Sequence, residues 1–167
     1  VNRIAKEGNY STNVFARNLK LNKAFKFAVI LPDDNEYWKT QRLGIESSAL
    51  EYISLGVELD FFLFDRHNED SFLTKSKKAM ATETDALIMA TLLEYEAGFI
   101  CEEFDKKKTP YVFVDSNFEG SKPLAFIGQD SVQSGYLAAK LLCIGQTISH
   151  EVLIVRFKDF DNINKTI

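Results

Sequence analysis

The chain has 167 residues and a net charge of −4, and its composition, 46% hydrophobic and 26% charged, is ordinary for a soluble globular protein with one real core. No apolar stretch approaches the roughly 20 residues that a bilayer-spanning helix needs, which excludes a membrane-spanning protein. The two cysteines, Cys101 and Cys143, lack the spacing of metal ligands. We expect two buried thiols in a reducing compartment.

Charge is unevenly distributed along the chain. Residues 1–26 carry six basic side chains and one acidic side chain, a net charge of +5, which leaves −9 for the remaining residues. A basic arm on an acidic body is typical of a protein whose one end meets a polyanion such as nucleic acid. A basic tail that is merely solvated is the alternative.

From residue 26 onward, strand and helix patterns alternate. Apolar runs that end at turn residues predict strands, and apolar residues at helical spacing predict helices. In chain order we expect a strand at Phe27–Leu31, a helix from Glu36 to about Leu55 that Gly56 ends, a strand at Val57–Phe64, a helix at Ser71–Met80, a strand at Ala86–Ala90, a helix at Glu94–Lys107, strands at Tyr111–Val114 and Leu124–Ile127, a helix from Ser131 to about Ile144, and a strand at Val152–Val155.

This alternation, with strands that are apolar almost throughout, predicts an α/β fold with a parallel sheet covered on both faces. Right-handed crossovers make a doubly wound lobe the economical topology. The strand at Val152–Val155 would begin another unit, yet only about a dozen residues follow it. We therefore expect residues 26–148 to form one lobe and residues 149–167 to be the start of a second, truncated lobe.

Two acidic residues follow predicted strands on the same edge of this sheet. Asp115 comes directly after Tyr111–Val114, and Asp130 lies between the strand that ends at Ile127 and the helix that begins at Ser131. In open α/β sheets small ligands bind at this edge, and two carboxylates there suit a ligand with many hydroxyl donors, such as a sugar. Asp130 and Gln133 also fit a capping box, so a purely structural role for Asp130 is the alternative.

A second candidate group follows the first strand. Asp33 lies in an acidic cluster there, and Tyr37 and Trp38 open the next helix. Aromatic rings at a helix start suit stacking against a sugar or base ring, although they could equally pack the first turn onto the lobe. The carboxylates could also form the acidic pocket of a phosphoacceptor signalling domain, but Thr91 stands where such a domain needs an Asp.

The sequence gives no sign of enzyme chemistry. No glycine-rich phosphate loop follows the first strand, no Gly-x-Ser-x-Gly elbow occurs, and the two histidines, His67 and His150, fall in predicted loops. We expect a non-enzymatic protein without cofactor or metal ion.

The N-terminal arm holds a further motif. Tyr10–Lys20 contains a capping residue at Thr12 or Asn13 and then about two turns of helix, too short to be stable alone in water. Arg17 and Lys20 would meet phosphates, with Leu19 projecting beside them. An apolar wedge flanked by cations is the pattern of proteins that kink DNA from the minor groove.

Together the arm and the lobe resemble the lac repressor/galactose repressor (LacI/GalR-type) family of bacterial transcriptional regulators, whose sensor domains resemble periplasmic sugar-binding proteins (type I). Tyr10-x-x-Asn13-x-x-Ala16-Arg17-x-Leu19 is similar to the family's linker and hinge helix, and Gly128–Leu142 to the strand–helix unit before the crossover to the second lobe. Two departures stand out: Ser11-Thr12 replaces a common linker proline, and Thr91 stands where a proline often follows the third strand.

The resemblance implies roles for named residues. Residues 1–25 would be the end of the DNA-binding headpiece and the hinge helix, with the hinge contacts at Asn13, Ala16, Arg17, Leu19 and Lys20, and with Leu19 as the wedge. The effector, a small molecule and most simply a carbohydrate, would be bound by Asp33, Tyr37, Trp38, Asp115 and Asp130.

The resemblance further implies a cytoplasmic homodimer that binds operator DNA through the hinge and through a helix-turn-helix that this chain does not contain. The alternative is a periplasmic sugar-binding protein of a transport system, which would have no use for the hinge leucine.

Overall fold

The computed structural model describes residues 24–33, 35–145 and 151–155. The five predicted hinge contacts, from Asn13 to Lys20, lie outside these residues, so the hinge helix stays a prediction. No helix among the described residues is long and apolar enough to cross a membrane.

Strands and helices alternate along the described chain as the sequence predicts. The elements are β1 (Phe25–Pro32), α3 (Glu36–Glu51), a short 3-10 helix η1 (Ile53–Leu55), β2 (Val57–Phe64), α4 (Glu69–Ala81), β3 (Ala86–Ala90), α5 (Glu94–Lys107), β4 (Tyr111–Val114), β5 (Ala125–Ile127) and α6 (Ser131–Cys143). Gly56 ends the α3–η1 segment in the left-handed conformation, at φ 72°, as a glycine at that position allows.

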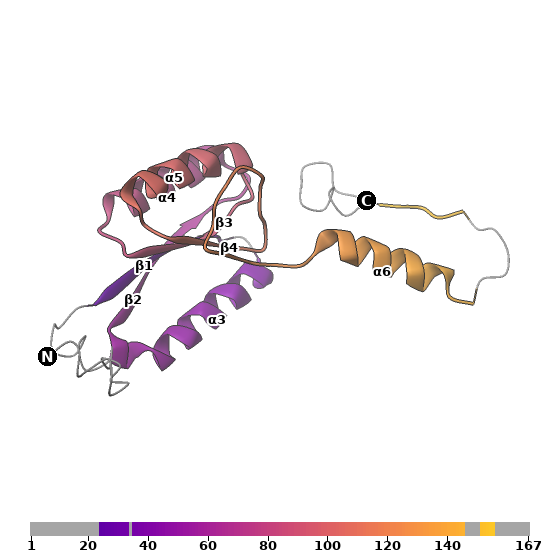
Figure 1. The fold of residues 1–167 in the computed structure, drawn as a ribbon, viewed down its shortest axis with the longest axis horizontal. Helices are drawn as coiled ribbons and strands as arrows, with labels where there is room; N and C mark the ends of the chain where they lie inside the picture. Colours follow the sequence, from indigo (N-terminus) through magenta and orange to yellow (C-terminus); the bar gives the residue numbers. More distant parts are fainter. Residues whose placement is uncertain (1–23, 34, 146–150, 156–167) are drawn as a thin grey trace, which may run out of the picture.

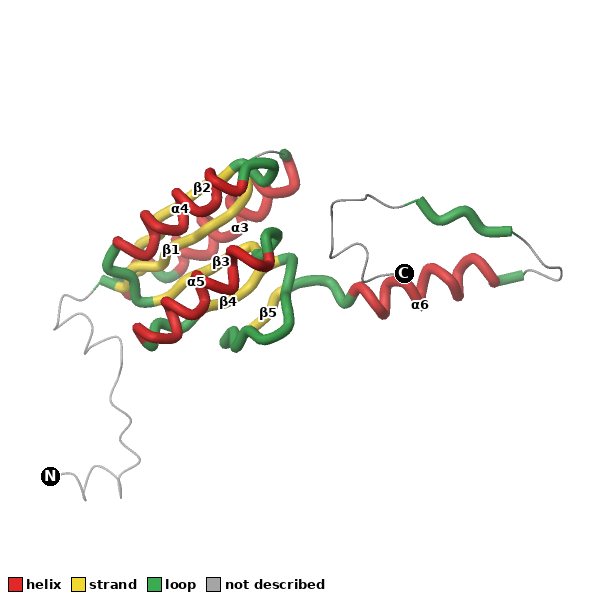
Figure 2. Tube along the Cα trace, turned by 90° about the horizontal axis from the view of Figure 1, so that it is seen from above, coloured by secondary structure: helices red, strands yellow, loops and turns green. Residues whose placement is uncertain are grey.

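All five strands are parallel and form one sheet in the order β2-β1-β3-β4-β5. The sheet lies between α4 and α5 on one face and α3 on the other, so the lobe is doubly wound (Figure 1). The chain passes from β1 to β2 in one direction and from β2 to β3 in the other, which places the topological switch point between β1 and β3. Figure 2 shows the strands with their helices from above.

Two clusters of buried side chains hold these layers together, one on each face of β1. Ala28 and Ile30 pack with α4 and α5, where Phe72 and Phe104 are the largest members, while Val29 and Leu31 pack with α3. Successive strand residues point to opposite faces, so a strand buried on both faces must be apolar at every position. This explains the continuous run Phe27–Leu31.

Local capping sets the helix starts. Asn35 Oδ1 accepts a hydrogen bond from the Trp38 N–H at 3.1 Å, and Asn68 Oδ1 accepts one from the Ser71 N–H at 3.0 Å. Because Asn68 is the cap, α4 begins at Glu69, two residues before the sequence-based boundary.

Two expectations need correction, one about the strand at Val152–Val155 and one about Cys143. Residues 151–155 form no strand, although Val152–Val155 has strand composition, because no neighbouring strand pairs with them among the described residues. Helix α6 forms as predicted, but it lies away from the sheet and none of its residues is buried (Figure 1). Cys101 is buried in α5, where burial raises the pKa of its thiol to about 12, whereas Cys143 at the end of α6 is exposed.

Candidate functional site

The candidate site lies at the carboxyl edge of the sheet, where the loops after β1 and β4 meet. The Tyr37 hydroxyl donates a hydrogen bond to Asp115 Oδ1 at 2.5 Å, although the two residues are 78 positions apart in the sequence. Tyr37 stands in the first turn of α3 and Asp115 directly follows β4. The tertiary structure therefore joins two of the residues that the sequence singles out.

The Tyr37 hydroxyl is held in its protonated form. Partial burial, followed by the hydrogen bond and negative charge of Asp115, raises the pKa of Tyr37 from 10.0 to about 12, against a smaller lowering by a hydrogen bond with Gln41. Tyr37 remains a donor at neutral pH, and its side chain keeps 49% of its surface exposed. One ring with a free surface and one carboxylate thus stand side by side at the edge.

Asp115 adopts an unusual backbone conformation. Its φ is 67°, in the left-handed region that residues other than glycine, asparagine and aspartate seldom adopt. The Ser116 N–H donates to the Val114 carbonyl oxygen at 2.8 Å across it, which closes a three-residue turn. The Asp115 N–H donates to the Ile127 carbonyl oxygen at 2.9 Å, so the start of the turn is also tied to β5.

Two buried polar residues, Thr91 and Ser116, hold this turn in place. The Thr91 N–H donates to Ser116 Oγ at 3.0 Å, and the Thr91 hydroxyl donates to the Ser116 carbonyl oxygen at 2.8 Å. Both residues are almost fully buried. From the sequence, Thr91 stood out only as the residue in place of a phosphoacceptor aspartate or a family proline, and Ser116 did not stand out; their positions after adjacent parallel strands were the available signal. A proline at position 91 could not supply the N–H.

The structure separates the two aromatic candidates. Trp38 is only 3% exposed and packs with Val29, Leu31 and Ala90, whereas the neighbouring Tyr37 ring meets it edge-on with centroids 5.0 Å apart. Trp38 is therefore a core residue of the described lobe. Of the two rings expected to stack on a ligand, Tyr37 has the accessible surface.

The remaining two acidic candidates lie on the loops of the same edge. The Asp33 N–H continues the β1–β2 ladder by donating to the Phe64 carbonyl oxygen at 2.9 Å, and its exposed carboxylate is 4.0 Å from Arg42 Nη1. Asp130 Oδ1 accepts from the Gln133 N–H at 2.9 Å and caps α6, as its spacing predicted. This bond supports the capping role and leaves its second carboxylate oxygen for other partners.

This arrangement suits binding of a neutral, hydroxylated ligand. Carboxylates that accept hydrogen bonds, next to an aromatic ring at the topological switch point, match the small-molecule sites of open α/β sheets. Among the described residues no group of three or more His, Cys, Asp or Glu side chains could hold a metal ion.

Comparisons with solved structures support the same α/β fold. No family model and no curated protein matches the chain. A crystal structure assigned provisionally as a LacI transcriptional regulator from Bacteroides fragilis is similar at 28% identity and a TM-score of 0.69, over 73% of this chain and 43% of that one. GanP, a glucose-galactose binding protein from Geobacillus stearothermophilus, is similar at 31% identity and a TM-score of 0.63, over 72% and 42%.

An ABC transporter solute binding protein from Bacillus halodurans C-125 with bound myo-inositol matches at 20% identity and a TM-score of 0.61, over 71% of this chain and 42% of that one. The chain thus spans about two fifths of the length of these structures. The sheet order, the helix placement and these matches all indicate the same fold. The described chain has the α/β fold of a single lobe of a type I periplasmic-binding-protein-like domain.

Proposed function

We propose that this chain is the N-terminal lobe of a module that binds a carbohydrate or a related polyol, and that it serves a ligand-responsive transcriptional regulator. The observation that carries the binding proposal is the contact between Tyr37 and Asp115 at the switch point of the sheet. The proposed role is binding, without catalysis.

Each group in the site has a definite task in this proposal. The Asp115 carboxylate has acceptor capacity beyond the bond from Tyr37 and would take hydroxyl protons of the ligand. The exposed ring surface of Tyr37 would pack on an apolar face of a sugar ring. Asp33 and Asp130 would add acceptors from the neighbouring loops. Two of the matched proteins are named for sugars or carry a polyol, which supports this ligand class.

The regulatory part of the proposal rests on the N-terminal residues and on one comparison. Residues 1–26 are strongly basic, and the family resemblance assigns the hinge contacts to Asn13, Ala16, Arg17, Leu19 and Lys20. The match at 28% identity to the provisionally assigned LacI regulator supports this assignment. In this proposal a cytoplasmic homodimer contacts operator DNA through these residues.

A second function has its own support. The match to GanP, at 31% identity, favours a sugar-binding protein that serves a transport system. Both functions use the same Tyr37–Asp115 site, and they differ in whether residues 1–25 bind DNA.

Saturation-transfer NMR tests the shared part, because it detects the weak binding that a single lobe offers. The 167-residue chain is mixed with glucose, galactose, fructose or myo-inositol at millimolar concentration. We expect a signal from at least one of these ligands. Loss of a charged acceptor costs about 1.5–3 kcal/mol, so Asp115→Asn should weaken binding roughly 10- to 100-fold.

Asp60→Asn is the matched control, because Asp60 is exposed on β2 and the change removes the same charge. Binding that is equal in the Asp115 and Asp60 variants, or no signal from any of the four polyols, would overturn the proposal.

A further inference from the structure

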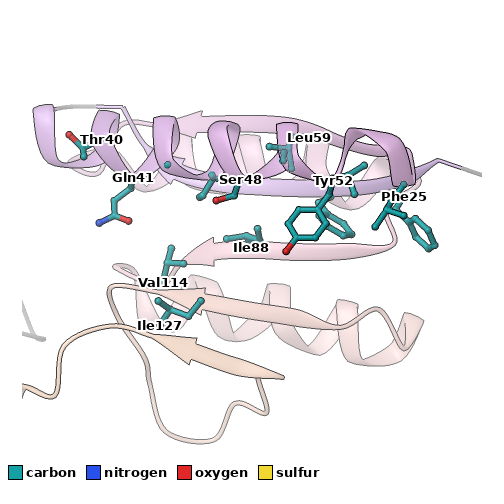
Figure 3. A pocket seen from close by; sticks show the side chains of 15 residues that line it. Phe25, Thr40, Gln41, Ser48, Tyr52, Leu59, Ile88, Val114 and Ile127 are labelled. Carbon is teal, nitrogen blue, oxygen red and sulfur yellow. The ribbon is translucent and has the colours of Figure 1, made fainter. Parts of the chain in front are cut away.

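The contact between Tyr37 and Asp115 has a third member, Gln41. Gln41 follows Tyr37 by one turn of α3, and its side chain forms a hydrogen bond with the Tyr37 hydroxyl. Figure 3 shows Gln41 projecting from α3 toward Val114, the residue directly before Asp115. The three polar side chains therefore form a continuous hydrogen-bonded chain from α3 to the end of β4.

The surroundings of Gln41 explain why its amide turns to Tyr37. Gln41 is half-buried and lines an open groove of about 790 Å³ beside α3. Most of the residues that line this groove are apolar, Ile45, Val114 and Ile127 among them, and their side chains cannot form hydrogen bonds. A partly buried amide needs a polar partner, and the Tyr37 hydroxyl supplies one.

The chemistry of the three groups fixes the direction of both hydrogen bonds. The Asp115 carboxylate can only accept, so the single proton of the Tyr37 hydroxyl points to Asp115 Oδ1, at 2.5 Å. Toward Gln41 the Tyr37 oxygen can then only accept, and Gln41 must present its amide N–H. The same direction explains why Gln41 lowers the pKa of Tyr37, since a donor favours the ionised oxygen.

This direction decides which polar groups remain for a ligand. The Tyr37 proton is held by Asp115, and the Tyr37 oxygen already accepts from Gln41. The Asp115 carboxylate has about four acceptor positions, one of which Tyr37 takes. A ligand that reaches this chain therefore meets an acceptor and must bring its own hydrogen-bond donor.

The charges at this edge of the sheet favour the same ligands. Asp33 and Asp130 are exposed and add two carboxylates to that of Asp115. Arg42 stands between two carboxylates, 4.0 Å from Asp33 and 3.8 Å from Glu46, which offset its positive charge. The negative charge that remains repels a ligand carboxylate or phosphate and attracts a protonated amine.

We propose that Gln41 is a positioning residue of the sugar site, which holds the Tyr37 hydroxyl toward Asp115 so that the site offers acceptors to its ligand. The ligands are then neutral sugars, polyols and amino sugars, and phosphorylated or acidic sugars are excluded. This ligand class rests on the proposed function and narrows it. A sugar hydroxyl or a protonated amine donates to Asp115, whereas a phosphate group brings more acceptors and more negative charge.

The role of Gln41 is tested first without any ligand. Gln41→Met removes the amide donor and keeps a side chain of similar length, so the pKa of Tyr37 should rise further. Fluorine NMR of the chain labelled with ring-fluorinated tyrosine, whose phenol is more acidic, follows this titration in an accessible pH range. Tyr37→Phe assigns the signal.

Thr40→Val is the matched control, because the neighbouring Thr40 hydroxyl donates to the Glu36 carbonyl oxygen at 2.8 Å. It should leave the Tyr37 pKa unchanged. Fluorescence of Trp38, which is buried in the lobe, reports whether each variant still folds. A Tyr37 pKa that does not rise in a folded Gln41→Met lobe, or that rises equally in Thr40→Val, would overturn the role of Gln41.

The ligand class is tested by saturation-transfer NMR. Glucose, galactose, fructose and myo-inositol are each compared with their monophosphate esters, and the first two also with glucosamine and galactosamine at about pH 6, where an amine is protonated. An ester should bind at least about 10-fold more weakly than its parent polyol, and an amino sugar at least as tightly. Gln41→Met should weaken polyol binding about 5-fold, the effect of one hydrogen bond, and Thr40→Val should not.

The outcomes distinguish the ligand class from the proposed function. If none of the four polyols binds, the proposed function is overturned and the ligand class with it, whether or not an ester binds. If a polyol binds and its phosphate ester binds as tightly, only the ligand class is overturned and carbohydrate binding stands. Polyol binding that is unchanged in a folded Gln41→Met lobe would overturn the positioning role of Gln41.

Discussion

The Thr91 hydroxyl donates a hydrogen bond to the Ser116 carbonyl oxygen at 2.8 Å, and both residues are buried. Together with the bond from the Thr91 N–H to Ser116 Oγ, this contact locks the loop after β3 to the loop after β4. Asp115 lies between β4 and Ser116, so its left-handed conformation is held from both sides. The position of the carboxylate at the sheet edge thus depends on a pair of residues that need not touch the ligand.

Replacing Thr91 by valine should destabilise the lobe by about 1–3 kcal/mol, because the isosteric change removes the hydroxyl and leaves the buried Ser116 carbonyl oxygen without this donor. Urea denaturation measures the difference. Thr82→Val is the matched control, because the exposed Thr82 hydroxyl donates only to the Lys78 carbonyl oxygen, and it should change stability by less than about 0.5 kcal/mol. Equal losses in the two variants would contradict the locking role.

The stability of Asp115 variants should depend on how well each residue tolerates the left-handed backbone conformation, and not on charge alone. Asparagine tolerates a φ of 67°, so Asp115→Asn should leave the free energy of unfolding within about 0.5 kcal/mol of the original. A β-branched valine at this φ should cost about 1–3 kcal/mol. Thermal and urea unfolding of the two variants provides the test, and a valine variant as stable as the asparagine variant would show that the turn relaxes.

Tyr37 should titrate near pH 12, well above an ordinary tyrosine, because burial and then Asp115 favour its neutral form. NMR of ring-labelled tyrosine, assigned with Tyr37→Phe, follows this titration, and Asp115→Asn should move the pKa down toward 10. Since the folded pKa lies above the unfolded value of 10.0, the stabilising contribution is fully present below pH 10 and is lost as the pH rises toward 12. A Tyr37 pKa near 10 in the unsubstituted protein would rule out the contact.

The DNA-binding part of the proposal predicts a specific effect of Leu19→Ala in the full-length protein. Loss of an apolar wedge should lower affinity for the operator far more than affinity for random DNA, because wedge insertion acts only where the duplex is kinked. Fluorescence anisotropy at fixed salt measures both affinities. Arg17→Ala is the comparison, since loss of a phosphate contact should weaken both complexes to a similar degree. Equal losses on both DNAs for Leu19→Ala would exclude the wedge.

Most of the fold follows from the sequence because its signals are local. Apolar runs set β3 and β4 at the predicted residues, the largely apolar segment Val57–Phe64 sets β2, and the left-handed Gly56 closes the segment after α3. The cap at Asp130 likewise depends on residues three positions apart. Parallel order then follows from strand–helix alternation, since short loops and right-handed crossovers leave few topologies. The sequence also places Asp33, Asp115 and Asp130 on loops at one edge of the sheet, with Tyr37 at a helix start on the same edge.

The tertiary structure decides what depends on partners distant in the chain. Whether Tyr37 or Trp38 faces the solvent depends on which ring the sheet buries, and spacing alone treats the two alike. The contacts of Tyr37 with Asp115 and of Thr91 with Ser116 join residues 78 and 25 positions apart, so no local pattern encodes them. Val152–Val155 has the composition of a strand, but a strand exists only where a neighbouring strand accepts its hydrogen bonds. The same dependence applies to α6: its apolar residues are evident from the sequence, but burial needs a partner element, and none of its residues is buried in the described structure.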